Sequence, residues 1–315
     1  MLDKDILREI NKTVDELGLD ASTIEKDYYV TQVIHALSDL ENEYFRLVFC
    51  GGTCLAKAHQ IVQRMSEDVD FKIEKKPATA GFSKSHILKE LKAFRIELQS
   101  KLDIPLLTAS EPVVRNEGKY SRIELTYPSV FTINDNLRPH ILFEFTLSNI
   151  RCDVVTRSVK TLMEETIPEL VLFPDRATLC VHVHETAIEK WVGLTRRIIA
   201  IERGSHHDDR SLIRHVYDLN AIELAEPIPD DFLMLAKDIV LTDAQQFKNQ
   251  NPEYAANPAE EINRSLYLLR TKPIWRERYY DFIENMVFNP DLAADYDKAI
   301  NVISGLSKKV ISYLD

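Results

Sequence analysis

The chain has few of the features that mark disordered, membrane-embedded or disulfide-linked proteins. Only 8 of its 315 residues are glycine and no low-complexity tract is present, which argues against disorder. No run approaches the roughly 18 apolar residues of a membrane span, and MLDKDILREI lacks the basic end and apolar core of a signal peptide. The four cysteines form no CxxC pair, so we expect reduced thiols in a cytoplasmic protein without a membrane partner.

The chain also has fewer basic residues than acidic ones. The 39 Lys and Arg residues against 50 Asp and Glu residues give a net charge of −11. This balance argues against a protein that coats nucleic acid, although a local basic patch would still allow a nucleotide or an RNA as substrate. The 45% hydrophobic and 28% charged residues are typical of a globular protein, and the length suits two domains at about 150 residues each.

Apolar periodicity divides the chain into a mixed first half and a helical second half. Ser22 and Glu25 form a capping-box pattern that predicts the start of the second helix. From about residue 184 the pattern stays helical to the end, so we predict an α+β domain over 1–180 and a helical domain over 181–315. The first domain has apolar patterns that predict helices over 3–18, 22–40, 53–64 and 84–102 and strands over 45–50, 69–73, 121–128 and 140–149.

Three acids crowd the start of the strand predicted in VDFKI. Glu67, Asp68 and Asp70 repel one another unless a cation or water offsets their charge. On a strand, Asp68 and Asp70 share a face and lie about 6 to 7 Å apart, whereas Glu67 points the other way. Two convergent carboxylates suit Mg²⁺, which binds through one or two carboxylates together with waters and substrate phosphates. The alternative is a pair of solvated acids at a strand edge.

A glycine turn lies just upstream, between the predicted strand FRLVFC and the predicted helix TCLAKAHQIVQR. Gly51 and Gly52 would let the backbone approach a phosphate closely, and Thr53 adds a hydroxyl at the start of a helix. A turn needs glycine in any case, so GG alone is weak. The order of strand, GGT, helix and RxSxDxD together predicts one unit that holds a triphosphate and its metal ion.

The segment FCGGTCLAKAHQIVQRMSEDVDF closely resembles the first motif of the AbiEii/AbiGii-type toxin family, a branch of the polymerase-β-like nucleotidyltransferase superfamily. IEKDYYVTQVI resembles the N-terminal helix of that family, and WRERYYDFIENMVF resembles its C-terminal part. ETAIEKWVGLTRR and RHVYDL resemble its lysine and aspartate motifs, so the resemblance covers nearly the whole chain. It implies a nucleotidyltransferase-like mixed sheet with flanking helices, followed by a helical domain that contributes the lysine and aspartate.

The resemblance also implies roles for residues of the first domain. Asp68 and Asp70 would bind Mg²⁺, with a third carboxylate from a neighbouring strand. Glu144 in ILFEFTL is the preferred candidate for this metal ligand, and Glu124 in RIELTY is the alternative. Ser66 occupies the serine position before the two aspartates, where its hydroxyl would reach a phosphate or else bond to the backbone.

In the second domain the resemblance points to a lysine on the helix ETAIEKWVGLTRRIIAIER. Lys190 would contact phosphate, and Gly193 and Arg197 follow on the same helical face, where a phosphate chain would have room. No acid lies three or four residues from Lys190 to pair with it along this helix, and a solvated lysine is the alternative.

Asp218 in RHVYDL matches the last aspartate of the family, which would orient Lys190 or the acceptor; a surface acid is the alternative. Many relatives have RD where this chain has Arg214 and His215, and Asp209 of the GSHHDD loop is a candidate for the missing acid. Several basic residues could form a patch for an RNA acceptor: Lys75, Lys76, Arg196, Arg197, Arg203, Arg210 and Arg214.

The resulting hypothesis is an Mg²⁺-dependent nucleotidyltransferase that moves an NMP from an NTP to an acceptor hydroxyl. The resemblance suggests the 3′ end of a tRNA or another RNA, or alternatively a protein hydroxyl. It also suggests growth arrest by the toxin of a toxin–antitoxin or phage-abortive-infection system, with a cognate antitoxin as partner. One alternative is a metal-dependent nuclease that uses Asp70 and the pair Glu74 and Lys76, and another is a catalytically silent NTP-binding protein. The residues expected to hold the NTP are Gly51, Gly52, Thr53, Ser66, Lys190 and Arg197.

Overall fold

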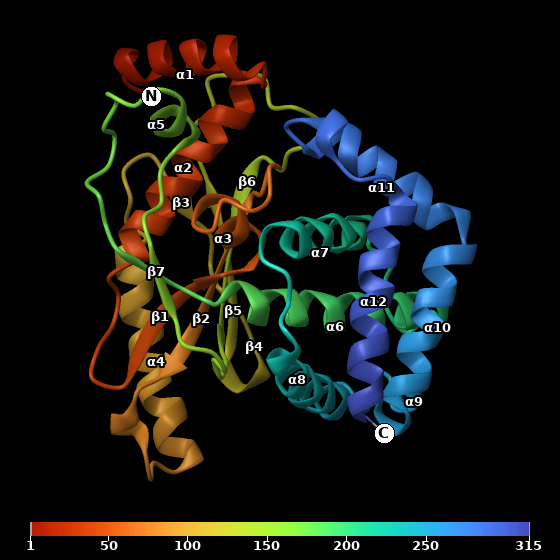
Figure 1. Ribbon diagram of the computed structural model, residues 1–315. Helices are drawn as coiled ribbons and strands as arrows, with labels where there is room; N and C mark the ends of the chain where they lie inside the picture. The colour runs from red at the N-terminus through yellow and green to blue at the C-terminus, as the bar shows by residue number, and fades with distance from the viewer. Residues whose placement is uncertain (1, 315) are drawn as a thin grey trace. The chain divides into compact units, whose positions relative to one another are not determined.

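The computed structural model describes residues 2–314, and the chain forms two compact units (Figure 1). The first unit comprises the chain up to Gln60 together with Met65–His182, and the second comprises Ile61–Arg64 together with the chain from Val183 on. The division after His182 lies close to the predicted boundary at 180. The sequence pattern did not predict that Ile61–Arg64 would belong to the second unit.

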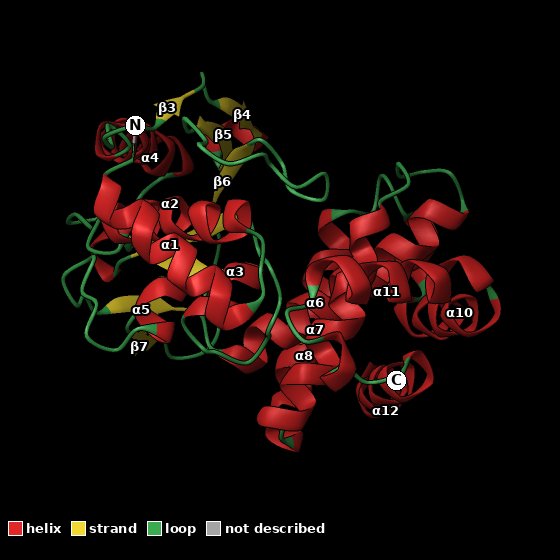
Figure 2. Cartoon of the chain, turned by 90° about the horizontal axis from the view of Figure 1, so that it is seen from above, coloured by secondary structure: helices red, strands yellow, loops and turns green. Residues whose placement is uncertain are grey.

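The first unit is built on one mixed sheet, drawn in yellow in Figure 2. Its strands are β1 (Phe45–Cys50), β2 (Asp68–Lys75), β3 (Thr108–Ala109), β4 (Val113–Arg115), β5 (Tyr120–Thr126), β6 (His140–Leu147), β7 (Val155–Arg157) and β8 (Thr178–Cys180). Among the described residues the strand order is β3-β5-β6-β2-β1-β8-β7, and β4 also pairs with β5. Strand β2 pairs antiparallel with β1 and parallel with β6, so the predicted acid pair begins a strand that has a neighbour on each side.

The alternating pattern of β2 sorts its side chains onto two faces, because successive residues of a strand point to opposite sides of the sheet. Val69, Phe71 and Ile73 are buried and join the apolar core of the unit with Phe143 and Phe145 of β6. The helices of this unit are α1 (Lys4–Leu17), α2 (Ala21–Leu37), α3 (Gly51–Lys57), α4 (Lys84–Lys101) and α5 (Leu162–Thr166). Residues of α2 and α4 contribute to the same core, and α1, α2 and α5 pack together (Figure 1).

The helix predicted over 53–64 is much shorter in the structure. Helix α3 ends at Lys57, and Gln60 has a φ of 55°, in the left-handed region that a continuing helix cannot use. Val62 has the helical spacing that suggested a longer helix, but it is buried as part of the second unit. The prediction was wrong because the apolar pattern reflects burial in two different units.

The capping box predicted at Ser22 and Glu25 is also wrong. Helix α2 begins at Ala21 with Asp20 as its N-cap, so Ser22 lies inside the first turn. Glu25 instead accepts a hydrogen bond from the Val130 backbone N–H at 3.0 Å. A capping box does occur at Thr161, which starts the short helix α5.

The second unit consists mainly of helices, drawn in red in Figure 2. Its helices are α6 (Val183–Glu202), α7 (Arg214–Ala225), α8 (Leu233–Gln246), α9 (Pro252–Ala256), α10 (Pro258–Thr271), α11 (Pro273–Met286) and α12 (Tyr296–Leu314). Helix α6 is largely buried, and its Trp191 donates a hydrogen bond from Nε1 to the Ser307 hydroxyl at 2.9 Å. Among residues 2–314, no helix combines the length and apolar character that crossing a bilayer requires. Short 3₁₀ helices occur in both units. The first unit has η1 (Pro77–Thr79) and η2 (Asn116–Gly118), and the second has η3 (Arg210–Ile213), η4 (Asp230–Phe232) and η5 (Pro290–Leu292).

Candidate active site

The two aspartates of the acidic motif begin β2 on the face opposite the core. Asp70 is paired with Cys50 on β1 and with Glu144 on β6, and Asp68 is paired with Leu142. Residues directly opposite each other on neighbouring strands share a face, so the Asp70 and Glu144 side chains are neighbours on the polar face. The register therefore puts Asp68, Asp70 and Glu144 on the same face of two adjacent strands.

The two candidates for the third carboxylate differ in their distance from β2. Glu144 lies on β6, which pairs with β2, whereas Glu124 lies on β5, one strand further away, and forms an ion pair with Arg122 at 3.1 Å. The Tyr120 hydroxyl donates a hydrogen bond to Glu144 Oε1 at 2.5 Å. Burial and this carboxylate raise the pKa of Tyr120, so the tyrosine stays a donor. The geometry favours Glu144 over Glu124 as the partner of the acid pair.

The glycine turn lies directly against Asp70. Gly51 has a φ of 81°, and a Cβ added there would meet the Asp70 carboxylate and would lie 3.1 Å from the Asp70 Cβ. A side chain at position 51 would be strained and would displace the carboxylate. Asp70 can therefore occupy its position only because Gly51 has no side chain.

The hydroxyl groups of Thr53 and Ser66 link this turn to the start of β2. The Thr53 hydroxyl donates a hydrogen bond to the Asp68 backbone carbonyl and lies 2.8 Å from the Ser66 hydroxyl. Thr53 is fully buried, whereas Ser66 is half-buried. Thr53 thus holds the strand in place, and Ser66 is the more accessible of the two hydroxyls predicted to contact phosphate.

Two cations offset the crowding of acids at the start of β2. Glu67 forms an ion pair with Lys26 of α2, and Asp68 forms one with Arg138 of the loop before β6. Lys26 is fully buried, and burial lowers its pKa although the charge of Glu67 acts in the opposite direction. Sequence reasoning missed both cations. The run EKD inside an apolar helix, in IEKDYYV, is the signal that could have revealed Lys26.

The donor set on β2 fits a hard cation. Asp68 and Asp70 offer two carboxylates, and Mg²⁺ commonly takes its other ligands from waters and substrate phosphates. Within the described residues there is no group of three or more His, Cys, Asp or Glu side chains that could hold a metal ion. At the start of β2, Asp68 and Asp70 are therefore the two carboxylates that would bind the metal ion, together with waters and substrate phosphates.

The second unit contains a buried cluster of charges around Asp218. The Lys190 Nζ lies 2.8 Å from Asp218 Oδ2, and Arg64 donates from Nε to Oδ1 at 2.7 Å and from Nη2 to Oδ2 at 2.9 Å. Burial alone would raise the pKa of Asp218, but Arg64 and Lys190 outweigh it and hold the pKa well below its usual range. Burial lowers the pKa of Lys190 more than its attraction to Asp218 raises it. Asp218 is therefore held as a carboxylate between two cations, Arg64 and Lys190.

Orienting Lys190 was one of two roles that the family resemblance implied for Asp218, whereas the third member of the cluster was not predicted. Arg64 is the arginine of the RxSxDxD pattern, and it belongs to the segment Ile61–Arg64 that packs with the second unit. The Phe288 N–H donates to the Gln63 carbonyl at 3.0 Å, and Arg64 forms a β-bridge with Val287. This segment is therefore held in the helical unit by backbone hydrogen bonds as well as by the Arg64 side chain.

Other predicted residues of the second unit lie near this cluster along α6 and α7. Arg197 forms an ion pair with Asp209, and burial lowers its pKa although Asp209 acts in the opposite direction. Burial and the charge of Lys190 lower the pKa of His215 well below its usual range, so the imidazole is neutral. A Cβ added at Gly193 would meet no heavy atom within 4 Å.

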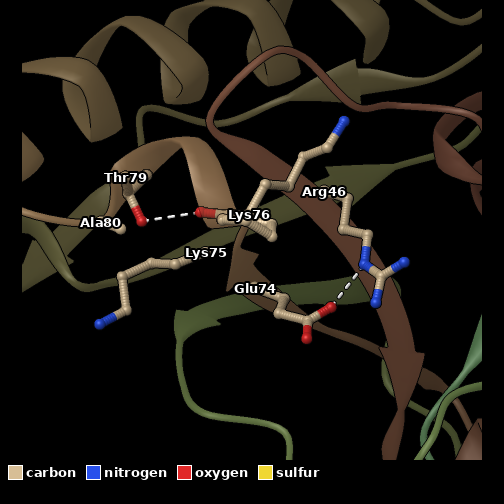
Figure 3. A pocket seen from close by; sticks show the side chains of 7 residues that line it. Arg46, Glu74, Lys75, Lys76, Thr79 and Ala80 are labelled. Carbon is tan, nitrogen blue, oxygen red and sulfur yellow. Dashed lines mark hydrogen bonds and ion pairs between the residues drawn. The ribbon is translucent and has the colours of Figure 1, made fainter.

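The structure separates two of the predicted basic residues from the acid pair. Lys75 and Lys76 lie at the far end of β2, and a rise of ~3.3 Å per residue puts Lys75 about 16 Å from Asp70. They line a pocket with a volume of 590 Å³ together with Arg46, which forms an ion pair with Glu74 (Figure 3). These two lysines do not surround Asp68 and Asp70.

Comparison with known proteins identifies the family to which the chain belongs. Residues 36–302 match the family described as nucleotidyl transferase AbiEii toxin of type IV toxin–antitoxin systems. Among solved structures, the chain is similar to MenT4, the nucleotidyltransferase toxin Rv2826c from Mycobacterium tuberculosis H37Rv. The identity is 15%, the TM-score is 0.42, and the match covers 97% of this chain and 98% of that chain. No curated protein matches the chain.

Proposed function

We propose a specific reaction for this chain, which belongs to the AbiEii family of nucleotidyl transferase toxins: it moves an NMP from an NTP to an acceptor hydroxyl with Mg²⁺ as its metal ion. The family match shows a nucleotidyltransferase toxin. The observation that supports the finer proposal is the position of Asp70, which lies against Gly51 and beside Glu144 on the polar face of the sheet.

In this proposal the residues of the first unit bind the metal and the nucleotide. Asp68 and Asp70 would hold Mg²⁺, and Glu144 of the neighbouring strand would add a ligand. The ion would neutralise charge on the triphosphate and lower the pKa of the acceptor hydroxyl. The backbone at Gly51 and Gly52 and the hydroxyl of Ser66 contact phosphate, whereas Thr53 acts by holding the turn against β2.

The residues of the second unit supply positive charge. The acceptor oxygen forms a bond to the α-phosphorus as the bond to pyrophosphate breaks, so negative charge builds on the leaving group. Lys190 would neutralise this charge, which is an electrostatic contribution to catalysis. Asp218 orients the Lys190 ammonium and is itself held by Arg64, and Arg197 would add a further contact to phosphate.

The acceptor that we propose is the 3′ end of a tRNA, with growth arrest as the result and a cognate antitoxin as partner. The description of the family as toxins of toxin–antitoxin systems supports this role. The NTP and the tRNA would be met in the cytoplasm. A protein hydroxyl is the alternative acceptor, and the experiment below distinguishes the two.

The test is transfer of label from each of the four α-³²P-labelled NTPs to total RNA or to total protein. We expect label on intact tRNA with Mg²⁺ present, and mass spectrometry of the RNA 3′ ends should find the added NMP. Label on protein would show that the acceptor is a protein hydroxyl. Shortened RNA without label would support the nuclease. NTP binding without turnover would support a catalytically silent NTP-binding protein. Asp68→Asn combined with Asp70→Asn should abolish transfer while the fold is kept; an active double variant contradicts the mechanism.

A further inference from the structure

Arg138 occupies an unusual place, because its guanidinium forms an ion pair with one of the proposed metal ligands. The ion pair joins Nη1 of Arg138 to the Asp68 carboxylate. The side chain of Arg138 is 40% exposed, whereas that of Asp68 is only 12% exposed. The arginine therefore reaches the acid from the solvent side and remains partly hydrated.

The backbone of Arg138, in contrast, is held by the buried Lys26 and by its partner Glu67. Its N–H donates to Glu67 Oε2 at 2.8 Å, and its carbonyl accepts from Lys26 Nζ at 2.7 Å. Lys26 and Glu67 form an ion pair with each other, and the Lys26 side chain is fully buried. Because two hydrogen bonds hold the backbone while the side chain is partly exposed, the guanidinium could change its partner while the Cα stays in place.

The charges at this point of the sheet favour such a change of partner. Without a metal ion, Arg138 offsets the repulsion between Asp68 and the neighbouring Asp70. A divalent cation on Asp68 would repel the guanidinium, and a triphosphate would bring new negative charge beside it. Arginine remains charged at all relevant pH values and bonds phosphate oxygens through two parallel N–H donors.

We propose that Arg138 is a substrate-binding residue that pairs with Asp68 in the free enzyme and moves to the triphosphate when the metal and the nucleotide bind. This inference rests on the proposed function, because it assumes that Asp68 is a metal ligand. The competing explanation is a purely structural ion pair between a loop and a strand, in which case removal of Arg138 would lower stability and leave metal binding unchanged.

Binding measurements on the full chain distinguish these explanations without the need for turnover. We compare the wild type with Arg138→Gln, Arg138→Lys and a matched control, Arg176→Gln. Arg176 belongs to the same unit, is 43% exposed and forms an ion pair with Asp39 at 3.1 Å. One measurement is Mn²⁺ binding without nucleotide, by electron paramagnetic resonance. The other is calorimetric binding of non-hydrolysable α,β-methylene NTPs in Mg²⁺, with thermal unfolding as a check on the fold.

We expect Arg138→Gln to bind Mn²⁺ alone about threefold more tightly, because a competing cation is gone, and to bind the tightest NTP analogue about tenfold more weakly. Arg138→Lys should bind Mn²⁺ like the wild type, because the charge is kept, and should bind the analogue with intermediate affinity. Arg176→Gln should match the wild type in both measurements.

Unchanged or weaker Mn²⁺ binding by Arg138→Gln would overturn the inference, and so would unchanged binding of the analogue. Failure of the wild type to bind any of the four analogues would instead overturn the proposed function itself. The two failures are therefore distinguishable in the same set of experiments.

Discussion

At the scale of single residues, Gly51 and Asp70 form the contact on which the proposed site depends. Gly51→Ala places a methyl group against the Asp70 carboxylate at a positive φ. We expect nucleotidyl transfer to fall at least about 100-fold, because small displacements of a reacting group have large effects, and we expect a loss of about 1 to 2 kcal/mol in unfolding free energy. Transfer is measured with labelled NTP, and stability is measured by denaturant unfolding.

Gly81→Ala is the matched control for this variant. Gly81 has a φ of 82°, nearly that of Gly51, but a Cβ there would meet nothing within 4 Å. It should show a similar backbone cost in stability and keep its activity. Equal activity of Gly51→Ala and Gly81→Ala would mean that Asp70 has no special position beside the turn.

A second prediction at the residue scale concerns the pH dependence caused by Asp218. Its pKa is held well below the unfolded value of about 3.9, so the folded state releases this proton more readily than the unfolded state. The stability that results is fully present above about pH 5 and is lost as the pH falls through 4 and below. Asp218→Asn should flatten this part of the acid-unfolding curve and, by leaving buried cations unpaired, cost about 3 to 5 kcal/mol at neutral pH.

Tryptophan fluorescence is a suitable probe for this experiment, because both tryptophans, Trp191 and Trp275, belong to the second unit together with Asp218. Substitution of the exposed Asp231 with Asn is the control, and it should leave the curve as in the wild type. A curve for Asp218→Asn that is as steep as that of the wild type would show that the ion cluster does not set the acid limit of this unit.

At the scale of elements, helix α2 holds three other segments of the first unit: the loop before β2, the loop before β6 and the start of α5. Glu25 accepts from the Val130 N–H, Lys26 pairs with Glu67, and Asp27 accepts from the Leu162 N–H at 2.7 Å. Three consecutive charged residues on one helix thus bind three different segments. The loops before β2 and before β6 are therefore held by side chains of α2.

This arrangement predicts a non-additive effect of two substitutions. Lys26→Met should lower the unfolding free energy by about 3 kcal/mol, because it leaves Glu67 without its cation near the protein interior. The pair Lys26→Met and Glu67→Gln should recover part of that loss. Denaturant unfolding followed by circular dichroism measures both, and additive losses would indicate that Lys26 and Glu67 are not coupled.

Much of the element pattern could be predicted from the sequence, because it reflects local periodicity. The strands around Asp70 and Glu144 and the helix 84–102 appear with nearly the predicted bounds, as β2, β6 and α4. The end of α3 could not be predicted, since Val62 keeps a helical spacing while it is buried in another unit.

At the scale of the whole molecule, the candidate site depends on pairings between distant residues that no local pattern reveals. The motif predicted the acids, but their cations Lys26 and Arg138 lie 41 and 70 residues away from Glu67 and Asp68. Arg64 and Asp218 are 154 residues apart. A short motif reveals the acids. The cations that pair with them, and so offset the cost of burying their charge, are brought near only by the tertiary fold.

The toxin role leads to a prediction at the cellular scale. Induced expression of the wild-type chain in a bacterial host should arrest growth, whereas Asp70→Asn at equal protein level should not, because nucleotidyl transfer would be lost. Growth curves and immunoblots measure this. Equal arrest by both variants would mean that toxicity does not come from the proposed chemistry.

The central claim is that Asp68 and Asp70 together bind the divalent ion of the nucleotide. The most direct measurement is anomalous diffraction from crystals grown with Mn²⁺ and an α,β-methylene NTP. The account predicts an anomalous peak about 2.1 Å from carboxylate oxygens of both Asp68 and Asp70, with the triphosphate beside Gly51. A metal–nucleotide complex bound elsewhere, with Asp68 still paired to Arg138, would contradict it.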